Sequence, residues 1–364
     1  MKQNKQNQII FFFPDIKTGG VEKNFFIISK YLTNFFKYIY LITGQNKNSK
    51  ISRKLNIIQT STFWFLISRR FGFIICSIKL FLISFKFKNS IIFSFQGNFY
   101  AIIIAIILKK KIIIRSNLSP QSWHGSNLRF IAFKYLLSKA DVVIVNSKDF
   151  SNQMKRIFKI KPTTIFNPVD IKNIKKLSHH KKKINFYKNN TVNLINVGRL
   201  VEQKNQIEIL IALKRLKKLI KNFRLLIIGY GPNKKNLEKY IIENNLKKYV
   251  KIIFTKNPIK FIKMSDVFIL SSKHEGLPNT LLEAAYLNKY IISSNCKTGP
   301  KEILKEYQNG ELYKPGNINQ LYLKIRQLNK IKLIDKKKDY SKNLLSFDYG
   351  LNLKRYLNTI IKLI

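Results

Sequence analysis

The stretch SSKHEGLPNTLLEAA, residues 271–285, decides the fold prediction because it reads as a loop that leads from a strand into a helix. It follows Val267–Leu270, a short apolar run that predicts a buried strand. Gly276 allows a close backbone approach in the loop, and Pro278 suits the first position of a helix. In open α/β sheets, ligands bind at the carboxyl ends of the strands, and helix N-termini attract anions. The stretch therefore predicts a phosphate-binding turn in a parallel α/β domain.

Two carboxylates flank this turn. Glu275 lies in the loop, and Glu283 lies inside the predicted helix, after Asn279 and Thr280 in its opening turn. A carboxylate only accepts hydrogen bonds and a vicinal diol donates two, so Glu283 suits a ribose and Glu275 suits sugar hydroxyls beside the phosphate. The alternative is that both acids are stabilised at a helix start by the helix dipole. The complete string EGLPNTLLE favours the sugar and phosphate interpretation.

The rest of the chain alternates short β-branched or aromatic runs with segments of helical period, a pattern typical of parallel sheets with crossover helices. The strands expected in the first half are Ile9–Phe13, Tyr38–Ile42, Ile91–Phe95, Lys111–Arg115, Val142–Asn146 and Thr163–Ile165. Those expected in the second half are Val192–Val197, Arg224–Ile228, Val250–Phe254, Val267–Leu270 and Tyr290–Ser293. We therefore predict two doubly wound, Rossmann-like sheets of the α/β class.

The length of 364 residues suits two such domains. Residues 171–190 are polar and basic without an apolar period, so we interpret them as a linker. His179 and His180 within this stretch lack further ligands at metal-site spacing. The predicted organisation is a first Rossmann-like domain at 1–170, the linker at 171–190, a second Rossmann-like domain at 191–346, and a closing helix at 347–364.

The composition is strongly basic, with 68 Lys and Arg against 18 Asp and Glu and a formal net charge of +50. Such a charge attracts nucleic acid or anionic lipid, but Lys, Ile and Asn are enriched throughout, and compositional bias explains the charge equally well. Cys76 and Cys296 stand far apart without ligand spacing, so neither a disulfide framework nor a zinc site is expected. The lack of a signal-peptide core and of a long apolar run predicts a cytoplasmic protein.

A second candidate motif, VGRLVEQKN at residues 197–205, follows another predicted strand. Gly198 makes the turn, Arg199 can bind phosphate oxygens with two donors, and Lys204 can act as a point charge. Together the two cations could neutralise a diphosphate leaving group. The alternative for Lys204 is an ordinary surface lysine in a lysine-rich chain. The glycine turn IGYGP at 228–232 is interpreted as structural first.

These motifs resemble those of the retaining glycosyltransferases of family 4, which have the GT-B architecture of two facing Rossmann-like domains. Residues 275–283 resemble that family's Glu-x7-Glu motif, and residues 198–204 resemble its Gly-Arg-Leu-x-x-x-Lys motif. The resemblance implies that Glu283 binds the donor ribose, that Glu275 touches the transferred sugar, and that the two cations contact the diphosphate. It implies catalytic roles for Glu275, Arg199 and Lys204, and donor contacts for Gly19, Gly20, Gly198, Gly276, Leu277, Asn279, Thr280 and Glu283.

The resemblance implies that residues 1–170 form the acceptor-binding domain, that residues 191–346 form the donor domain, and that the helix at 347–364 packs back on the first domain. The first half resembles the family more weakly. Gly19 and Gly20 follow the opening strand and are similar to the family's Gly-Gly loop, which brings backbone close to the donor phosphate or acceptor. After the strand that ends at Arg115, many members place a histidine where this chain has Asn117, so no catalytic histidine is assigned. Arg115 and Asn117 are the candidates for binding the acceptor.

The expected enzyme is a retaining hexosyltransferase that moves a sugar from a nucleotide-diphosphate donor, a UDP-sugar, to a saccharide acceptor in surface polysaccharide or lipopolysaccharide synthesis. No Asp-x-Asp motif occurs, so neither a metal nor another cofactor is expected. Residues 295–303 resemble a loop of lipopolysaccharide and capsule-type members and are expected to shape the donor domain.

The segment Phe63–Phe87, which mixes Trp64 and several Phe with Arg and Lys, suits an interfacial helix on an anionic membrane. The alternative is a buried helix of the first domain. If the segment binds a membrane, the acceptor is a lipid-linked saccharide and the protein is peripheral at the inner face of the cell membrane.

Two other functions stay open. A sugar-nucleotide epimerase of the same fold would turn over the donor without an acceptor. A basic nucleic-acid-binding protein would show steep salt dependence and tolerate Glu275→Ala. The sequence has no nucleic-acid recognition motif, so no nucleic acid is expected as a partner.

Overall fold

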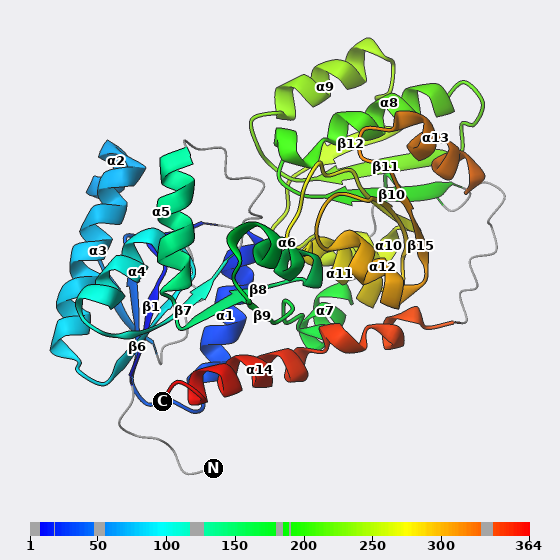
Figure 1. The fold of residues 1–364 in the computed structure, drawn as a ribbon. Coiled ribbons are helices and arrows are strands. Elements are labelled where there is room, and N and C mark those ends of the chain that lie inside the picture. Colours follow the sequence, from blue (N-terminus) through cyan, green and yellow to red (C-terminus); the bar gives the residue numbers. More distant parts are fainter. Residues whose placement is uncertain are drawn as a thin grey trace. The chain divides into compact units, whose positions relative to one another are not determined.

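The computed structural model describes residues 8–17, 19–46, 55–116, 127–179, 185–188, 191–328 and 338–364. The chain folds into two compact units, each built on a parallel β-sheet with flanking helices (Figure 1). Unit 1 consists of the chain up to Pro168 together with Tyr349–Ile364, and unit 2 consists of Val169–Asp348. The prediction of an α/β fold with two Rossmann-like sheets is confirmed.

Unit 1 has a seven-stranded sheet in the order β5-β3-β1-β6-β7-β8-β9, and its strands pair in parallel. The strands are β1 (Gln8–Phe12), β3 (Ile39–Thr43), β5 (Asn56–Gln59), β6 (Ser90–Ser94), β7 (Lys111–Arg115), β8 (Val142–Val145) and β9 (Thr163–Thr164). A separate parallel pair joins β2 (Asp15–Ile16) to β4 (Gln45–Asn46). The strand order reverses between β1 and β6, so the topological switch point of this sheet lies there.

Helices cover both faces of this sheet. They are α1 (Gly20–Leu32), α2 (Phe63–Ile67), α3 (Arg69–Lys86), α4 (Asn98–Ile107), α5 (Asn127–Ser138), α6 (Lys148–Phe158) and α14 (Tyr349–Ile361). In β1, Ile9 and Phe11 belong to the core beside α1 and α14, whereas Ile10 and Phe12 belong to the core beside α3 to α6. A strand buried on both faces needs a continuous apolar run, which explains the sequence QIIFF.

The predicted closing helix is α14, which returns to unit 1. Its buried residues Leu353, Tyr356, Leu357 and Ile360 recur at helical spacing and join the core beside α1. The Tyr356 hydroxyl also accepts a hydrogen bond of 3.0 Å from Nε of Arg115, at the end of β7. The tail is therefore part of the interior of unit 1.

Unit 2 has a six-stranded parallel sheet in the order β12-β11-β10-β13-β14-β15. Its strands are β10 (Val192–Val197), β11 (Phe223–Ile228), β12 (Val250–Ile253), β13 (Val267–Leu270), β14 (Tyr290–Ser294) and β15 (Gly310–Tyr313). Its helices are α7 (Ile171–Ser178), α8 (Gln206–Leu216), α9 (Lys234–Glu243), α10 (Ile259–Met264), α11 (Asn279–Tyr286), α12 (Pro300–Tyr307) and α13 (Ile318–Gln327), with short 3₁₀ turns η2 (Glu202–Lys204), η3 (Tyr340–Asn343) and η4 (Leu345–Phe347).

Part of the predicted linker is a helix of unit 2. The Asp170 side chain accepts a hydrogen bond of 2.9 Å from the backbone N–H of Asn173 and so starts α7. Ile174 is buried, and the helix packs against α10 and α11. A single buried residue gives no apolar periodicity, and the sequence of this helix therefore looks like a linker. His179 ends the helix, and His180 lies outside the described residues.

The segment predicted as one interfacial or buried helix, Phe63–Phe87, forms two helices. Ser68 separates α2 from α3 with an extended backbone, and its side chain caps α3 by accepting from the N–H of Phe71 at 3.2 Å. Cys76 and Leu80 of α3 are buried against the sheet. In the described parts of the chain, no helix has both the length and the apolarity needed to span a bilayer.

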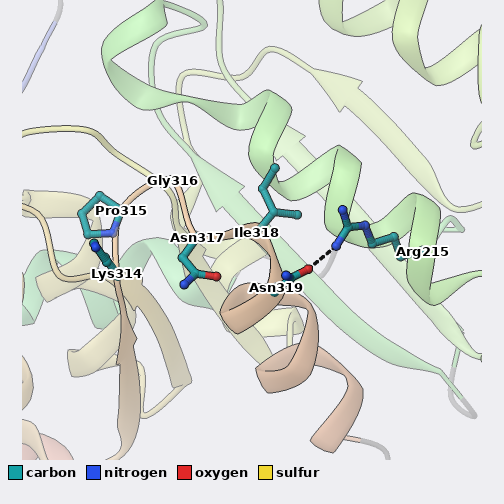
Figure 2. Close-up of a pocket in the computed structure, with 7 residues that line it drawn as sticks. All are labelled: Arg215, Lys314, Pro315, Gly316, Asn317, Ile318 and Asn319. Carbon is teal, nitrogen blue, oxygen red and sulfur yellow. Dashed lines mark hydrogen bonds between the residues drawn. The ribbon is translucent and has the colours of Figure 1, made fainter.

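Unit 2 also has an open groove of about 480 Å³ (Figure 2). It lies between Arg215 of α8 and residues 314–319, which form the β15–α13 loop and the start of α13, and the Arg215 guanidinium donates to Oδ1 of Asn319. It includes none of the residues that the sequence singled out for catalysis.

Candidate active site

The two motifs singled out in the second half follow β10 and β13, which are neighbours in the centre of the unit 2 sheet. The chain runs outward from β10 to β12 on one side and from β13 to β15 on the other. The topological switch point therefore lies between β10 and β13, where open α/β sheets bind ligands. The loops that leave these two strands meet at that edge.

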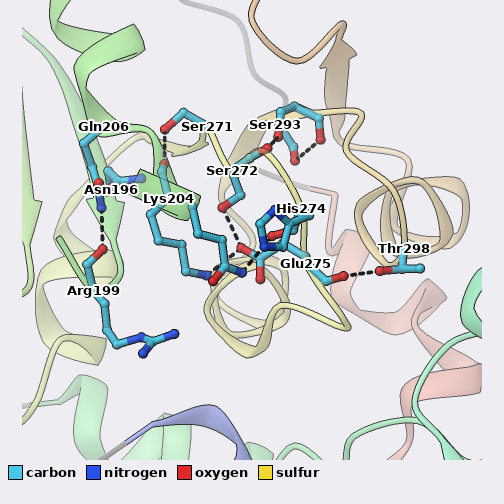
Figure 3. Close-up of polar contacts among 12 residues, drawn as sticks. Asn196, Arg199, Lys204, Gln206, Ser271, Ser272, His274, Glu275, Ser293 and Thr298 are labelled. Carbon is cyan, nitrogen blue, oxygen red and sulfur yellow. Dashed lines mark hydrogen bonds and ion pairs between the residues drawn. The ribbon is translucent and has the colours of Figure 1, made fainter. Parts of the chain in front are cut away.

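A buried ion pair joins the two loops (Figure 3). Lys204 Nζ lies 2.5 Å from Glu275 Oε1, although the residues are 71 positions apart in the sequence. The Ser272 hydroxyl donates to the same oxygen at 2.5 Å. The side chains of Lys204 and Glu275 are only 16% and 7% exposed, so water screens their attraction less than at the surface. The pair fixes both side chains at the switch point.

Side chains also bond to the backbone of these loops. The Ser271 hydroxyl donates to the carbonyl oxygen of Lys204 at 2.8 Å, which joins one loop to the other. Gln206 Nε2 donates to the carbonyl oxygen of Arg199 at 3.0 Å, which closes the loop that carries both cations. These bonds hold the backbone around the ion pair.

A third loop, which follows β14, also contacts Glu275. The Thr298 hydroxyl donates to the carbonyl oxygen of Glu275. Burial, together with the nearby Glu275 carboxylate, raises the pKa of the Cys296 thiol to about 12, so this thiol stays protonated and packs as an apolar group. Gly299 has a φ of +93°, and a Cβ there would lie 2.4 Å from the Gly276 carbonyl oxygen. Only glycine fits that position.

Glu283 projects from α11 and is buried. It is 4% exposed and Glu275 is 8% exposed, so both carboxylates are held inside unit 2 rather than in bulk water. The helix begins at Asn279, one residue later than predicted, and the Pro278 carbonyl accepts a first helical bond from Leu281 at 3.1 Å. Pro278 therefore precedes α11 instead of opening it.

Arg199 is placed differently from Lys204. It is exposed, and in Figure 3 its guanidinium lies apart from the pair of Lys204 and Glu275. The structure thus brings one of the two predicted cations to Glu275 and leaves the other at the surface.

The turn at 228–232 holds the loop after β10 in place. A Cβ on Gly229 would lie 1.9 Å from the Gly198 carbonyl oxygen, and one on Gly231 would lie 2.3 Å from that of Leu200. The structural interpretation of this turn therefore has a steric basis. At Gly198 itself, a Cβ would meet Lys204 at an ordinary 3.6 Å.

In unit 1, Gly19 and Gly20 lie where α1 begins, after β1 and at the switch point of that sheet. Both are exposed, and Gly19 has an extended backbone with φ of 179°. Their predicted donor contact stays a prediction.

Arg115 does not present itself to an acceptor. It is 1% exposed, Nη2 donates to Asn167 Oδ1 at 2.8 Å, and the guanidinium lies 5.5 Å from the centre of the Phe95 ring. With the Tyr356 bond, these contacts make Arg115 an internal link of unit 1. The sequence does not show these contacts, because the partners come from distant parts of the chain. Asn117, the other acceptor candidate, lies outside the described residues.

Sequence reasoning missed Ser272 and Thr298. The sequence gives only a weak indication of them, because each is a single hydroxyl residue in a loop that follows a strand of the unit 2 sheet. Among the described residues, no three His, Cys, Asp or Glu side chains are grouped so that they could hold a metal ion.

Comparison with known proteins finds similarity to glycosyltransferases over part of the chain. Residues 178–344 match the family model described as glycosyl transferases group 1. An uncharacterized glycosyltransferase of Methanocaldococcus jannaschii is 34% identical over 239 residues, which cover 60% of this chain and 59% of that protein. The N-acetylgalactosamine-N,N'-diacetylbacillosaminyl-diphospho-undecaprenol 4-alpha-N-acetylgalactosaminyltransferase of Campylobacter jejuni is 28% identical over 225 residues, 59% of each chain. The chain thus matches about three fifths of the length of these relatives.

The similarity in fold extends further than the similarity in sequence. The crystal structure of Anabaena HepE in complex with UDP has a TM-score of 0.77 at 16% identity and covers 98% of this chain and 100% of that chain. The fold of both units is therefore the GT-B fold. The match to the glycosyl transferases group 1 model, residues 178–344, covers nearly all of unit 2.

Proposed function

We propose that the protein is a retaining glycosyltransferase that moves a sugar from a UDP-sugar to a lipid-linked saccharide. The observation that carries this proposal is the 2.5 Å contact between Lys204 Nζ and Glu275 Oε1 at the switch point of unit 2. A cation suited to a diphosphate and a carboxylate suited to sugar hydroxyls meet there. The group 1 match and the named relatives support a transferase enzyme.

The cations of the site act on the leaving group. In the transfer, the bond between the anomeric carbon and the diphosphate oxygen breaks, and a bond to the acceptor hydroxyl oxygen forms on the same face of the sugar. The diphosphate keeps the electron pair of the broken bond, and its departing oxygen takes the proton that the acceptor hydroxyl loses. Lys204 and Arg199 stabilise the growing negative charge, and the positive end of α11 at Asn279 adds to their field.

The two buried carboxylates recognise hydroxyl groups of the donor. Glu275 receives the transferred sugar and Glu283 the ribose, since each carboxylate oxygen can accept the hydroxyl protons of a sugar. Gly276, Leu277 and Thr280 line the donor between the two acids. The choice of UDP is supported by the HepE structure, which holds UDP in a protein of the same fold.

The acceptor class is supported by a relative. The Campylobacter enzyme is named for a diphospho-undecaprenol-linked saccharide and an α linkage. A lipid-linked acceptor of surface polysaccharide synthesis requires the protein to work at the inner face of the cell membrane.

The proposal is tested with UDP-sugars in two steps. A thermal-shift screen of the full chain identifies the donor, and product analysis with membrane extract identifies the glycoside. A donor at about a hundredfold above its Kd adds roughly 2.7 kcal/mol of stability. Glu283→Ala abolishes that shift, whereas Glu238→Ala, on the exposed face of α9, keeps it.

Other outcomes identify the other functions. Consumption of a UDP-sugar without any acceptor would indicate an epimerase. Binding of RNA or DNA that weakens steeply with salt and survives Glu275→Ala would indicate a nucleic-acid-binding protein. Either result without a glycoside product contradicts the transferase proposal.

A further inference from the structure

The helix α3 exposes large apolar side chains along one side. They recur every three or four residues and therefore lie on one face of the helix, which we call the α3 stripe. Its members are Phe71 (51% exposed), Ile74 (42%), Ile78 (50%), Leu82 (52%) and Phe85 (70%). The opposite face, with Cys76 and Leu80, is buried against the sheet. The stripe is therefore not needed for the core of unit 1.

The neighbouring helix extends this apolar surface. In α2, which packs against α3, Phe63, Leu66 and Ile67 are 57%, 79% and 52% exposed. Large apolar side chains exposed together on two packed helices of a folded protein indicate a binding face.

Cations flank the stripe. At about 100° per residue, Arg70 lies on one side of it and Lys79 and Lys86 lie on the other, and all three are exposed. Arg69 is not part of this set, because it pairs with Asp15 at 3.1 Å. The stripe therefore has an apolar centre between two positive margins.

The sequence around the stripe has no negative charge to offset these cations. Between Glu22 and Asp141 the chain has 19 Lys and Arg and no Asp or Glu. The two units carry similar net charge, +26 and +24, but the acids of unit 2 are spread along its sequence, whereas this stretch of unit 1 has none. Compositional bias raises lysine everywhere and does not by itself remove every acid from one region.

We propose that the α3 stripe with its flanking cations lies on an anionic lipid bilayer, its apolar side chains at the boundary between headgroups and acyl chains. An apolar face with basic margins is the pattern of an interfacial helix. A second copy of the chain would place cations against cations, and nucleic acid would leave the apolar centre unmatched. If the protein has the proposed function, this surface brings the enzyme to a lipid-linked acceptor. That role rests on the proposed function, whereas membrane binding itself does not.

The test is co-sedimentation of the full chain with phosphatidylcholine vesicles, with and without phosphatidylglycerol. We expect binding only to the anionic vesicles, weakened by salt. Ile78→Asn with Leu82→Asn removes apolar area without changing the charge, and Lys79→Gln with Lys86→Gln removes charge without changing the apolar area. Each pair should lower binding by on the order of tenfold.

Matched controls lie in unit 2. Leu219→Asn changes an equally exposed apolar residue, and Lys247→Gln with Lys248→Gln removes the same charge. Neither should alter vesicle binding, and circular dichroism should show that all variants are folded.

Three results overturn the inference. The first is that the wild type does not bind anionic vesicles, and the second is that the stripe variants bind them as well as the wild type does. The third is that the wild type is a dimer which the stripe substitutions dissociate while vesicle binding persists. The UDP-sugar thermal shift separates this inference from the proposed function. A chain that binds anionic vesicles through the stripe but no nucleotide sugar would refute only the function.

Discussion

Glu275 is held by groups from three loops. One carboxylate oxygen accepts from Lys204 and Ser272, and its backbone carbonyl accepts from Thr298. These contacts fix the carboxylate before any sugar binds, and such preorganisation is what makes a polar group effective in catalysis.

The charge of this carboxylate is the property to test. Glu275→Gln keeps the size of the side chain but removes the negative charge next to Lys204 and the sugar. We expect kcat to fall by at least about a hundredfold, because the lost interaction is strongest in the transition state. The UDP thermal shift should remain, since Glu283 is unchanged.

Glu202→Gln is the matched control for this change. Glu202 pairs with Lys273 at 2.6 Å on the surface, in the loop beside the site. An equal loss of kcat in both variants, or none in Glu275→Gln, would contradict the catalytic role.

For single residues, the sequence indicated which side chains could bind a sugar diphosphate, but not which of them touch one another. Lys204 and Glu275 stand in recognisable motifs after strands, so each could be singled out. Their contact depends on β10 and β13 being neighbours, which no local pattern shows. The contact of Arg115 with Tyr356, 241 positions away, could not be read from the sequence for the same reason.

The turn that follows Lys204 depends on a buried acid at the start of α8. Asn205, in the left-handed region with φ of 49°, donates through Nδ2 to Glu208 Oε2 at 2.6 Å. Burial raises the pKa of Glu208 to about 7, and burial together with the nearby Glu208 carboxyl raises the pKa of Tyr313. Glu208 therefore helps to hold the backbone that positions Lys204.

This acid predicts a dependence of stability on pH. The pKa is raised from 4.5 in the folded protein, so the folded state binds the proton more tightly than the unfolded state. The contribution of Glu208 to the free energy of unfolding is therefore fully present below pH 4.5 and is lost as the pH rises through about 7. The loss amounts to roughly 3 kcal/mol.

Denaturant unfolding at about pH 5 and about pH 8 measures this effect. Glu208→Gln should flatten the difference, because an amide does not titrate. Glu243→Gln, in which an exposed acid of α9 is changed, should keep it. If the free energy of unfolding of Glu208→Gln still fell between the two pH values as in the wild type, Glu208 would not be the group responsible.

Elements with a strong apolar pattern could be predicted, and elements with mixed patterns could not. The central strands of both sheets are β-branched runs buried on both faces, so their positions were recognisable. The edge strands β5 and β15 are NIIQ and GELY, which are short and partly polar because an edge is only partly buried. For α7, the single buried Ile174 left no period to detect.

At the scale of the whole molecule, the two units share one arrangement, because the strand order of each sheet reverses at a central pair of strands. The family resemblance predicted this organisation and the helix that closes unit 1. The structure divides the chain after Pro168 and after Asp348, and it places α7, part of the predicted linker, in unit 2, which therefore starts earlier than the predicted 191. What the sequence did not show is how the tail is bound, namely through Tyr356 and Arg115.

That bond predicts separate stabilities for the two units. Tyr356→Phe leaves the buried Nε of Arg115 without its acceptor, which costs about 1–3 kcal/mol. Hydrogen exchange should therefore become faster in β1 and β7 and stay unchanged in β10 and β13, and the UDP thermal shift should persist.

Tyr135→Phe is the control, because that ring is 60% exposed in the same unit. Equal acceleration of exchange in both units would contradict the independence of the two folds.

The position of α14 has a consequence for biosynthesis. Leu353, Tyr356, Leu357 and Ile360 complete the hydrophobic interior of unit 1, and they are translated after every residue of Val169–Asp348. On the ribosome, the second globule can therefore mature while the first still waits for its last helix. The nascent amino-terminal half, rich in phenylalanine and lysine, is the part that must be kept from aggregating until then.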